Sequence, residues 1–338
     1  MSIEFGYVNA RVRGMSSRLL GSDAYASALA AEDIRAFQTV FAQTPYAAAY
    51  EEAGARTKNA LRAVDDALAE DFHATTRRML EFADGAPRAM IAALLRRYDL
   101  EDLKTVARAH HAGRRPDDLG EALTGAGDLR PAALEALVAA ADLPAAAQAL
   151  AITKHPLAGP FAKAARRYVE DRSLLAFEVA LDQAYFASLL DEAFGSDRPE
   201  SFRAHVRREI DAANVRTALK VHGRDVDVGS LFVPGGREIG RDAFERLAAE
   251  GLSAAGELGS RTFAALAEAE DLASAERAIR EALDTAALRA ARREPVGIAV
   301  VVRYLRAKEA EAAKLRLLAR GAYYQLPRES LEKELGRA

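Results

Sequence analysis

Residues 294–327 read EPVGIAVVVRYLRAKEAEAAKLRLLARGAYYQLP, and apolar residues recur in this stretch at intervals of three and four. That spacing places the residues from Ile298 to Leu318 on one face of an amphipathic helix. Pro295 stands just before the first of them, where a helix tolerates proline, and Gly321 favours a helix end. We therefore predict a long helix that begins after Pro295 and stops at Gly321.

The middle of this stretch carries a pattern that the chain repeats. It consists of an acid, two free positions, a polar residue, Leu or Val, a base, and a second base four residues later. The copies begin at Asp99, Asp211 and Glu311, which lie 112 and 100 residues apart. A glycine that favours a helix end follows each copy, at Gly113, Gly223 and Gly321.

Three copies at this spacing predict an internal triplication. We expect three similar helical subdomains, which comprise residues 1–115, 116–225 and 226–338. A competing interpretation is that acids and bases at helical spacing decorate a solvated helix face and pair along their own helix. A chain this rich in alanine, arginine and glutamate produces such matches by chance, so both interpretations stay open.

Composition favours an ordered helical protein. Half of the 338 residues are apolar and 29% are charged, and residues with high helix propensity dominate. The one stretch that resembles a strand runs from Val226 to Val233. We predict an all-α fold. The formal charge of −3 argues against a nucleic-acid partner, and the lack of cysteine excludes disulfides, thiolate catalysis and cysteine-based metal centres.

No motif for catalysis or for cofactor binding stands out. The phosphate-binding pattern GxxxxGK[ST] is absent from the sequence, and we interpret the glycine-rich residues 235–240 as a turn. Asp66 and Glu70 lie one helical turn apart, as in helical enzymes that hold Mg²⁺ against a diphosphate, but no second acidic cluster faces them. The six histidines form no HExxH pair. We expect no catalytic, cofactor-binding or metal-binding residue.

The N-terminus predicts no secretory signal, because Glu4 and two arginines interrupt it before any apolar stretch. The longest apolar run, residues 296–302, is far shorter than the roughly 20 residues that a membrane-spanning helix needs. We expect a cytoplasmic protein whose membrane association is peripheral.

Several segments resemble the C subunit of V-type and A-type rotary ATPases, which is called the d subunit in the eukaryotic complexes. They are YVNARVRG at residues 7–14, EIDAANVRTALK at 209–220, LFVPGGR at 231–237 and the whole stretch 294–327. The last is the most specific, because Pro295, Gly297, Tyr304 and Lys308 fall in the order of the family. Members often place Asn before the Leu-Arg pair, as Asn214 does, whereas Asp102 and Lys314 occupy that position in the other copies.

This resemblance implies an all-helical funnel of three similar subdomains with pseudo-threefold symmetry. It implies a non-catalytic central-stalk subunit that couples the central rotor shaft to the membrane rotor ring, for proton or sodium transport linked to ATP synthesis or hydrolysis. The expected partners are the shaft subunits and the ring, with neither nucleotide nor nucleic acid bound directly. The subunit would lie on the cytoplasmic side of the membrane.

The repeated bases are our candidates for the wall that faces the shaft. They are Lys104, Arg108, Arg216, Lys220, Arg316 and Arg320. Apolar and aromatic side chains near the ends of the subdomains, Phe232, Tyr323 and Tyr324, are candidates for contact with the ring. Two other classes of protein stay open. One is an all-helical adaptor or scaffold, and the other is a Mg²⁺-dependent helical transferase that uses the acids between Asp65 and Asp71.

Overall fold

The computed structural model describes residues 4–113, 123–195 and 197–335. Within these ranges every regular element is a helix, which confirms the all-α fold class. The chain divides into two compact units. The middle unit comprises Ala83–Leu283, and the terminal unit combines Glu4–Phe82 with Asp284–Ala338. The predicted division into three subdomains, and their funnel, stay predictions.

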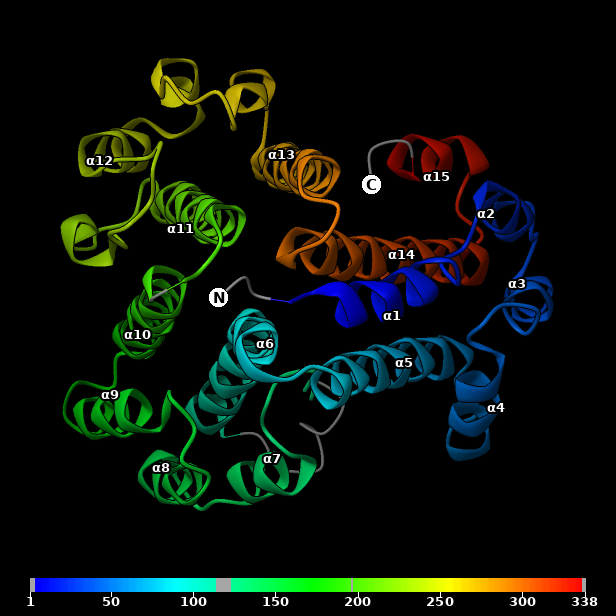
Figure 1. Ribbon diagram of the computed structural model, residues 1–338, viewed down its shortest axis with the longest axis horizontal. Helices are drawn as coiled ribbons and strands as arrows, with labels where there is room; N and C mark the ends of the chain where they lie inside the picture. The colour runs from blue at the N-terminus through cyan, green and yellow to red at the C-terminus, as the bar shows by residue number, and fades with distance from the viewer. Residues whose placement is uncertain (1–3, 114–122, 196, 336–338) are drawn as a thin grey trace. The chain divides into compact units, whose positions relative to one another are not determined.

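The terminal unit is built around two long helices, α14 and α5, with α1 beside both of them (Figure 1). Apolar residues of α14, including Leu315 and Leu318, pack against Phe37, Phe41 and Tyr46 from the N-terminal part of the chain. The unit's helices are α1 (Gly6–Ser16), α2 (Ser22–Leu29), α3 (Ile34–Phe41), α4 (Ala47–Arg56), α5 (Ala60–Phe82), the end of α13 (Leu272–Arg293), α14 (Ile298–Tyr324) and α15 (Arg328–Leu335).

The middle unit contains three more long helices, α6, α10 and α11, and the start of a fourth, α13. α6 packs against α10, and Val215 and Leu219 of α11 share a core with Phe244 of α12 and Ile279 of α13. The unit's helices are α6 (Gly85–Ala112), α7 (Pro131–Val138), α8 (Leu143–Ile152), α9 (Ala158–Asp171), α10 (Leu174–Phe194), α11 (Glu200–Val221), α12 (Arg241–Glu250), the start of α13 and the 3₁₀ turns η2 (Val228–Leu231), η3 (Gly251–Glu257) and η4 (Ala264–Glu268).

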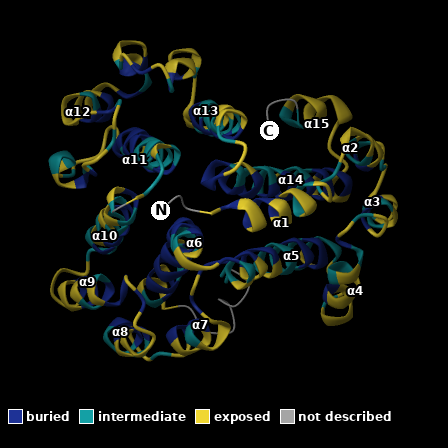
Figure 2. Cartoon of the chain, viewed as in Figure 1, coloured by how far each residue is buried: buried dark blue, intermediate teal, exposed yellow. Residues whose placement is uncertain are grey.

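Helical periodicity accounts for the burial pattern. In Figure 2 the helix α5 carries a buried side and an exposed side, as an amphipathic sequence requires. The aromatic rings of the terminal core are stacked in order, with centroids 5.7 Å apart for Phe37 and Phe41 and 5.5 Å apart for Phe41 and Tyr46.

Two local predictions were wrong. The stretch from Val226 to Val233 is not a strand but contains the 3₁₀ turn η2, because Asp227 and Gly229 interrupt its apolar residues and Ser230 hydrogen-bonds back to the Asp227 carbonyl. Gly321 does not end α14, which continues to Tyr324.

The glycine at 321 has a different role from a helix stop. A Cβ atom there would lie 2.5 Å from Leu331, so the missing side chain lets α15 approach α14. The other two glycines behave as predicted. Gly113 caps α6 in the left-handed conformation, and Gly223 follows the end of α11 with a φ of 74°.

Candidate functional site

The three copies of the repeated pattern lie on α6, α11 and α14, which we call the repeat helices. The acid that opens each copy is 3% exposed or less. Asp99 accepts hydrogen bonds from the backbone amides of Asp128 and Leu129 at 2.9 and 3.0 Å. Asp211 accepts from three consecutive amides, those of residues 237–239, at 3.0 Å. The acids therefore hold loops by their main chain.

The third acid does the same with a segment from the other end of the chain. Glu311 accepts hydrogen bonds from the Leu20 amide and from the hydroxyl of Tyr46. We call these three arrangements the first, second and third clasp. They hold residues 124–129, residues 233–239 and Leu20 respectively.

The clasps are equivalent in register. The amides of Leu129, Ile239 and Leu20 each bind a repeat-helix acid. Each of these residues lies two positions before the next helix, which begins at Pro131, Arg241 or Ser22. The repeat found in the sequence is therefore a repeat of contacts, and in the third copy those contacts join the two ends of the chain.

Glycine is required where the first two clasps close. A Cβ atom on Gly127 would lie 2.0 Å from the Asp99 carboxylate, and one on Gly236 would lie 2.1 Å from the Asp211 carboxylate. Real Cβ atoms do not approach an oxygen so closely. The glycine-rich residues 235–240 are thus a turn, as predicted, and the turn is shaped to receive Asp211.

The polar residue three positions after each acid adds to the clasp in two copies. Asp102 accepts hydrogen bonds from the amides of Thr124 and Gly125 at 2.7 and 2.9 Å. Asn214 exchanges two bonds with the backbone of Val233, at 2.8 and 2.9 Å. Lys314 differs, since its Nζ lies 5.7 Å from the centre of the Tyr25 ring.

Burial raises the pKa of three of these groups. Burial raises the pKa of Asp102 to about 6, although the Thr124 and Gly125 amides oppose the rise. Burial also raises the pKa of Asp211, again against the amides that it binds. Tyr46 has its pKa raised far above the ordinary 10.0, first by burial and then by the charge of Glu311.

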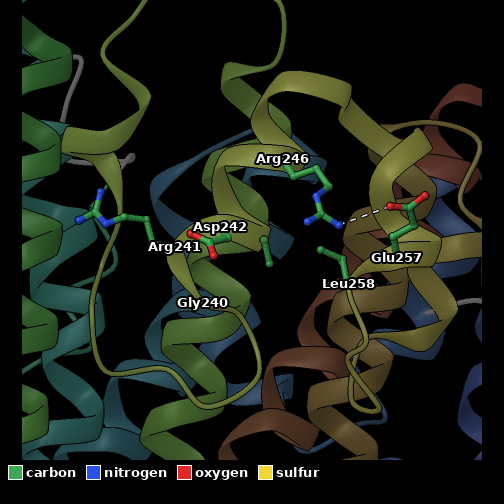
Figure 3. A pocket seen from close by; sticks show the side chains of 7 residues that line it. Gly240, Arg241, Asp242, Arg246, Glu257 and Leu258 are labelled. Carbon is green, nitrogen blue, oxygen red and sulfur yellow. Dashed lines mark hydrogen bonds and ion pairs between the residues drawn. The ribbon is translucent and has the colours of Figure 1, made fainter.

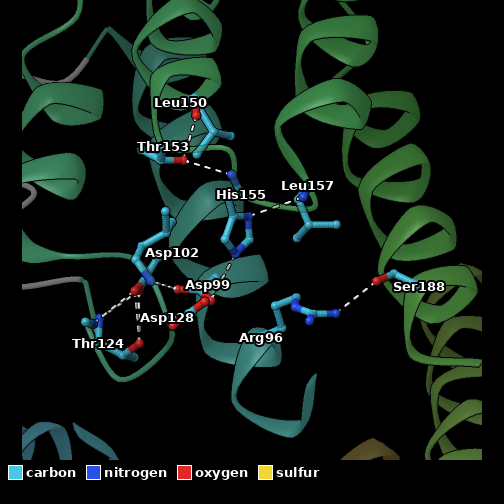
Figure 4. A network of polar contacts seen from close by, with 12 residues as sticks. Arg96, Asp99, Asp102, Thr124, Asp128, Leu150, Thr153, His155, Leu157 and Ser188 are labelled. Carbon is cyan, nitrogen blue, oxygen red and sulfur yellow. Dashed lines mark hydrogen bonds and ion pairs between the residues drawn. The ribbon is translucent and has the colours of Figure 1, made fainter. Parts of the chain in front are cut away.

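The first clasp also contains a histidine that the sequence did not single out. His155 Nε2 lies 3.2 Å from Asp99, and the Leu157 amide donates to His155 Nδ1 at 3.3 Å (Figure 4). No motif marks His155, because it reaches Asp99 from the turn between α8 and α9.

The repeated bases bind acids on neighbouring helices. Within the middle unit, Lys104 pairs with Asp182 and Arg108 binds Glu178 at 2.7 and 2.8 Å, both acids on α10. Arg216 binds Glu276 of α13 at 2.9 Å. The interpretation that these bases pair with the acids of their own pattern is wrong, because those acids bind loop amides.

The third copy follows the same plan within the terminal unit. Arg316 and Arg320 both reach Asp65 of α5, at 3.3 and 2.9 Å.

Lys220, the second base of the copy on α11, is exposed, and in the part of the chain that the structure describes it has no ion-pair partner. Five of the six predicted shaft-facing bases therefore tie a repeat helix to another long helix, and whether they face a partner stays a prediction.

The candidates for ring contact lie in both units and differ in exposure. Phe232, in the middle unit, is partly buried beside Phe244 and beneath the guanidinium of Arg241, which lies 5.0 Å from the centre of its ring. Tyr323 and Tyr324, in the terminal unit, are 45% and 63% exposed. Their role stays a prediction.

The acids between Asp65 and Asp71 on α5 form ion pairs with basic side chains. Asp65 binds the two arginines of α14, Asp66 lies 3.8 Å from Arg62, and Glu70 pairs with Arg56. Asp71 lies 2.8 Å from Lys308. Across the described ranges, no group of three or more His, Asp or Glu side chains is placed to hold a metal ion. These pairs do not favour the transferase alternative.

A shallow pocket of about 330 Å³ lies where α12 begins (Figure 3). Arg241 and Arg246 line it, but Arg241 is 3.6 Å from Glu245 and Arg246 is 3.4 Å from Glu257. Both arginines of the pocket therefore already have a glutamate as ion-pair partner.

Residues 8–334 match the family described as ATP synthase (C/AC39) subunit. The chain belongs to this family. Among members of the ATP synthase (C/AC39) subunit family, it is 37% identical to the C subunit of the V-type ATP synthase of Deinococcus radiodurans, over 99% of this chain and 92% of that one. It is 32% identical to the C subunit of the V-type ATP synthase of Thermus thermophilus, over 99% of both chains.

An archaeal relative extends the comparison. The C subunit of the A-type ATP synthase of Haloferax volcanii is 28% identical, over 97% of this chain and 96% of that one.

Among the residues of this chain that the structure describes, no helix is both long enough and apolar enough to cross a membrane.

Proposed function

We propose that this chain is the non-catalytic central-stalk subunit of a V-type or A-type rotary ATPase. It couples the central shaft to the membrane rotor ring, from the cytoplasmic side and without crossing the bilayer. The observation that carries this proposal is the match to the C subunit of V-type ATP synthases over 99% of the chain. An adaptor or a transferase has no comparable support.

The ion pairs between helices suit a part that transmits torque. Lys104, Arg216 and Arg316 each pair with an acid on another long helix, and Lys104 also pairs with Glu101 on its own helix. An ion pair between two helices resists sliding of one helix past the other. Where both partners are exposed, as for Arg316 and Asp65, such a pair contributes only about 0–1 kcal/mol, so its value lies in fixing the register of the helices.

Co-purification tests the proposal. The tagged full-length chain, isolated with its bound proteins under mild conditions, should bring down the shaft and ring subunits of a rotary ATPase. Membranes from cells that lack the chain should lose ATP-driven ion transport and regain it when the chain is supplied. Co-purification with unrelated proteins, together with intact ion transport in the deletion strain, would refute the assignment.

Among the repeated bases, we place Lys220 first as a contact for the shaft, because it is exposed and has no ion-pair partner in the described ranges. Lys220→Glu should weaken shaft binding at low salt more than at high salt, since exposed charges act mainly on association. The control is Arg167→Glu on α9, an exposed base outside the repeated pattern. Equal binding by both variants would remove Lys220 from the interface.

The aromatic pair at the end of α14 is our proposed contact for the ring. Tyr323 and Tyr324 meet edge to face with ring centroids 5.0 Å apart, and both are exposed. Replacing both by alanine should leave the melting temperature nearly unchanged and reduce capture of the chain by the isolated ring. Unchanged capture would assign the contact elsewhere.

A further inference from the structure

Two segments of the terminal unit, the start of α1 and the chain that joins α13 to α14, are rich in exposed arginine. Residues 4–14 and 289–297 together contain five arginines and two glutamates, in a chain whose formal charge is −3. The arginines are Arg11, Arg13, Arg289, Arg292 and Arg293, and all five are exposed. These two segments are therefore basic within an acidic chain.

Hydrogen bonds hold the two segments side by side. Asn9, which is buried, exchanges two hydrogen bonds with the backbone of Gly297, at 3.0 and 2.6 Å. Arg13 donates to the carbonyl of Pro295. α1 accordingly lies beside α14 (Figure 1). The exposed arginines of both segments therefore surround one fixed junction.

Three of the arginines lie on one side of α13. Arg289 precedes Arg292 and Arg293, the last residues of the helix, by three and four positions, and this spacing makes them neighbours on the helix surface. Val296 follows in the connecting chain and is 54% exposed although it is apolar. The end of α13 thus presents positive charge beside an exposed apolar side chain.

The start of α1 has the same combination of charge and apolar surface. Tyr7 is 62% exposed. The guanidinium carbon of Arg11, one turn later, lies 6.0 Å from the centre of the Tyr7 ring and 5.4 Å from that of Phe82. Across the described ranges, none of the five arginines has a carboxylate partner. Their charge is therefore not neutralised within the chain.

We propose that these five arginines, together with Tyr7 and Val296, form a basic face that binds the surface of a membrane containing anionic phospholipid. Lipid phosphates neutralise the guanidinium groups, while the two apolar side chains enter the boundary between headgroups and acyl chains. Arginine suits this boundary, because its apolar stem stays near the acyl chains while its charge stays among the phosphates. An acidic polypeptide would account for the arginines alone, whereas a bilayer accounts for the apolar side chains as well.

This inference deepens the proposed function and rests on it for a membrane beside the chain. Phospholipids diffuse and replace one another, so contacts with them hold the subunit near the bilayer without fixing its rotation. The two proposals fail separately. A chain that co-purifies with the shaft and ring subunits in detergent but does not bind lipid overturns this inference alone, while the assignment to the stalk is decided by the co-purification and ion-transport experiments.

Flotation of the full-length chain with vesicles tests the role of charge. The probe is phosphatidylcholine with about one-third phosphatidylglycerol, which should bind the chain more tightly than phosphatidylcholine alone and release it at about 1 M salt, where the Debye length is about 3 Å. Arg292→Gln combined with Arg293→Gln should weaken binding about 25-fold, since each arginine contributes about fivefold. The matched control, Lys163→Gln combined with Arg166→Gln, removes the same charge from exposed bases of α9 and should bind like wild type.

A tryptophan reporter tests the apolar contact. The chain has no tryptophan, so Val296→Trp introduces a single one. On anionic vesicles its emission should shift to shorter wavelength and should lose intensity when the lipid is brominated. The control Ile152→Trp, at an 83% exposed position of the middle unit, should show neither change.

Three results would overturn the proposal. The first is that wild type does not bind anionic vesicles, and binding to polyglutamate in their place would assign the basic face to an acidic protein. The second is that the control pair on α9 weakens binding as much as the pair on α13. The third is that the emission of Val296→Trp is the same with and without vesicles.

Discussion

Replacing Gly236 by alanine should break the second clasp. The new Cβ atom would lie 2.1 Å from an oxygen of Asp211, so either the carboxylate or the loop must move. That movement separates the acid from some of the three amides that it binds at 3.0 Å. Hydrogen bonds to a charged group contribute about 1.5–3 kcal/mol each, so losing one or two of them should lower the free energy of unfolding by about 2–5 kcal/mol.

Urea unfolding followed by circular dichroism measures this loss. With a slope of about 1–3 kcal/mol per molar urea, the midpoint should fall by about 1 M or more. The matched control is Gly240→Ala in the same loop, where the added Cβ meets nothing within 4 Å and φ is an ordinary −81°. If both variants unfold at the same urea concentration, the steric account of the clasp is wrong.

Three other changes probe the remaining contacts. Asp65→Asn frees the two arginines that bind Asp65, and all three side chains are at least one-third exposed. The free energy of unfolding should therefore fall by less than about 1 kcal/mol, and the difference should vanish at high salt. Thermal melting in low and high salt measures this. Asn9→Ala removes two buried hydrogen bonds to the backbone of Gly297 and should cost about 2–3 kcal/mol, seen as a lower urea midpoint. Burial of Glu238 raises its pKa, but hydrogen bonds from two hydroxyls and two backbone amides outweigh burial and hold that pKa below 4.5. The ionised Glu238 therefore stabilises the fold fully above pH 4.5, and this stabilisation is lost as pH falls through the folded pKa. Glu238→Gln should differ from wild type more at pH 7 than at pH 4 in urea unfolding.

The fold class could be read from composition and periodicity because helix propensity is local. The strand-like stretch at residues 226–233 shows the limit of that reasoning, since a turn closed by Ser230 outweighs its β-branched residues. Gly321 failed for another reason. A helix stop and a close approach of two helices both require glycine, and only the position of Leu331 distinguishes them.

The sequence predicted one side of each clasp, the acid, but not the backbone that the acid binds. The repeated acids could be found because they recur on helices, but their partners are backbone amides, which any residue supplies. Glu311 and Leu20 are separated by 291 positions, so no local pattern connects them. Gly127 and Gly236 were the available signal, because each follows its acid at a similar distance and lies where the clasp closes.

Joining the chain ends in one unit has a consequence for the order of folding. The helices that precede Ala83 leave the ribosome first, yet Asn9 and Leu20 have no partner until α14 has been made. The middle unit can complete its own contacts earlier. Because these contacts close a loop of nearly the whole chain, we expect the terminal unit to form more slowly than the middle unit. Until then its apolar N-terminal helices stay exposed to aggregation or to chaperones, and a truncation after residue 297 would leave them permanently without α14.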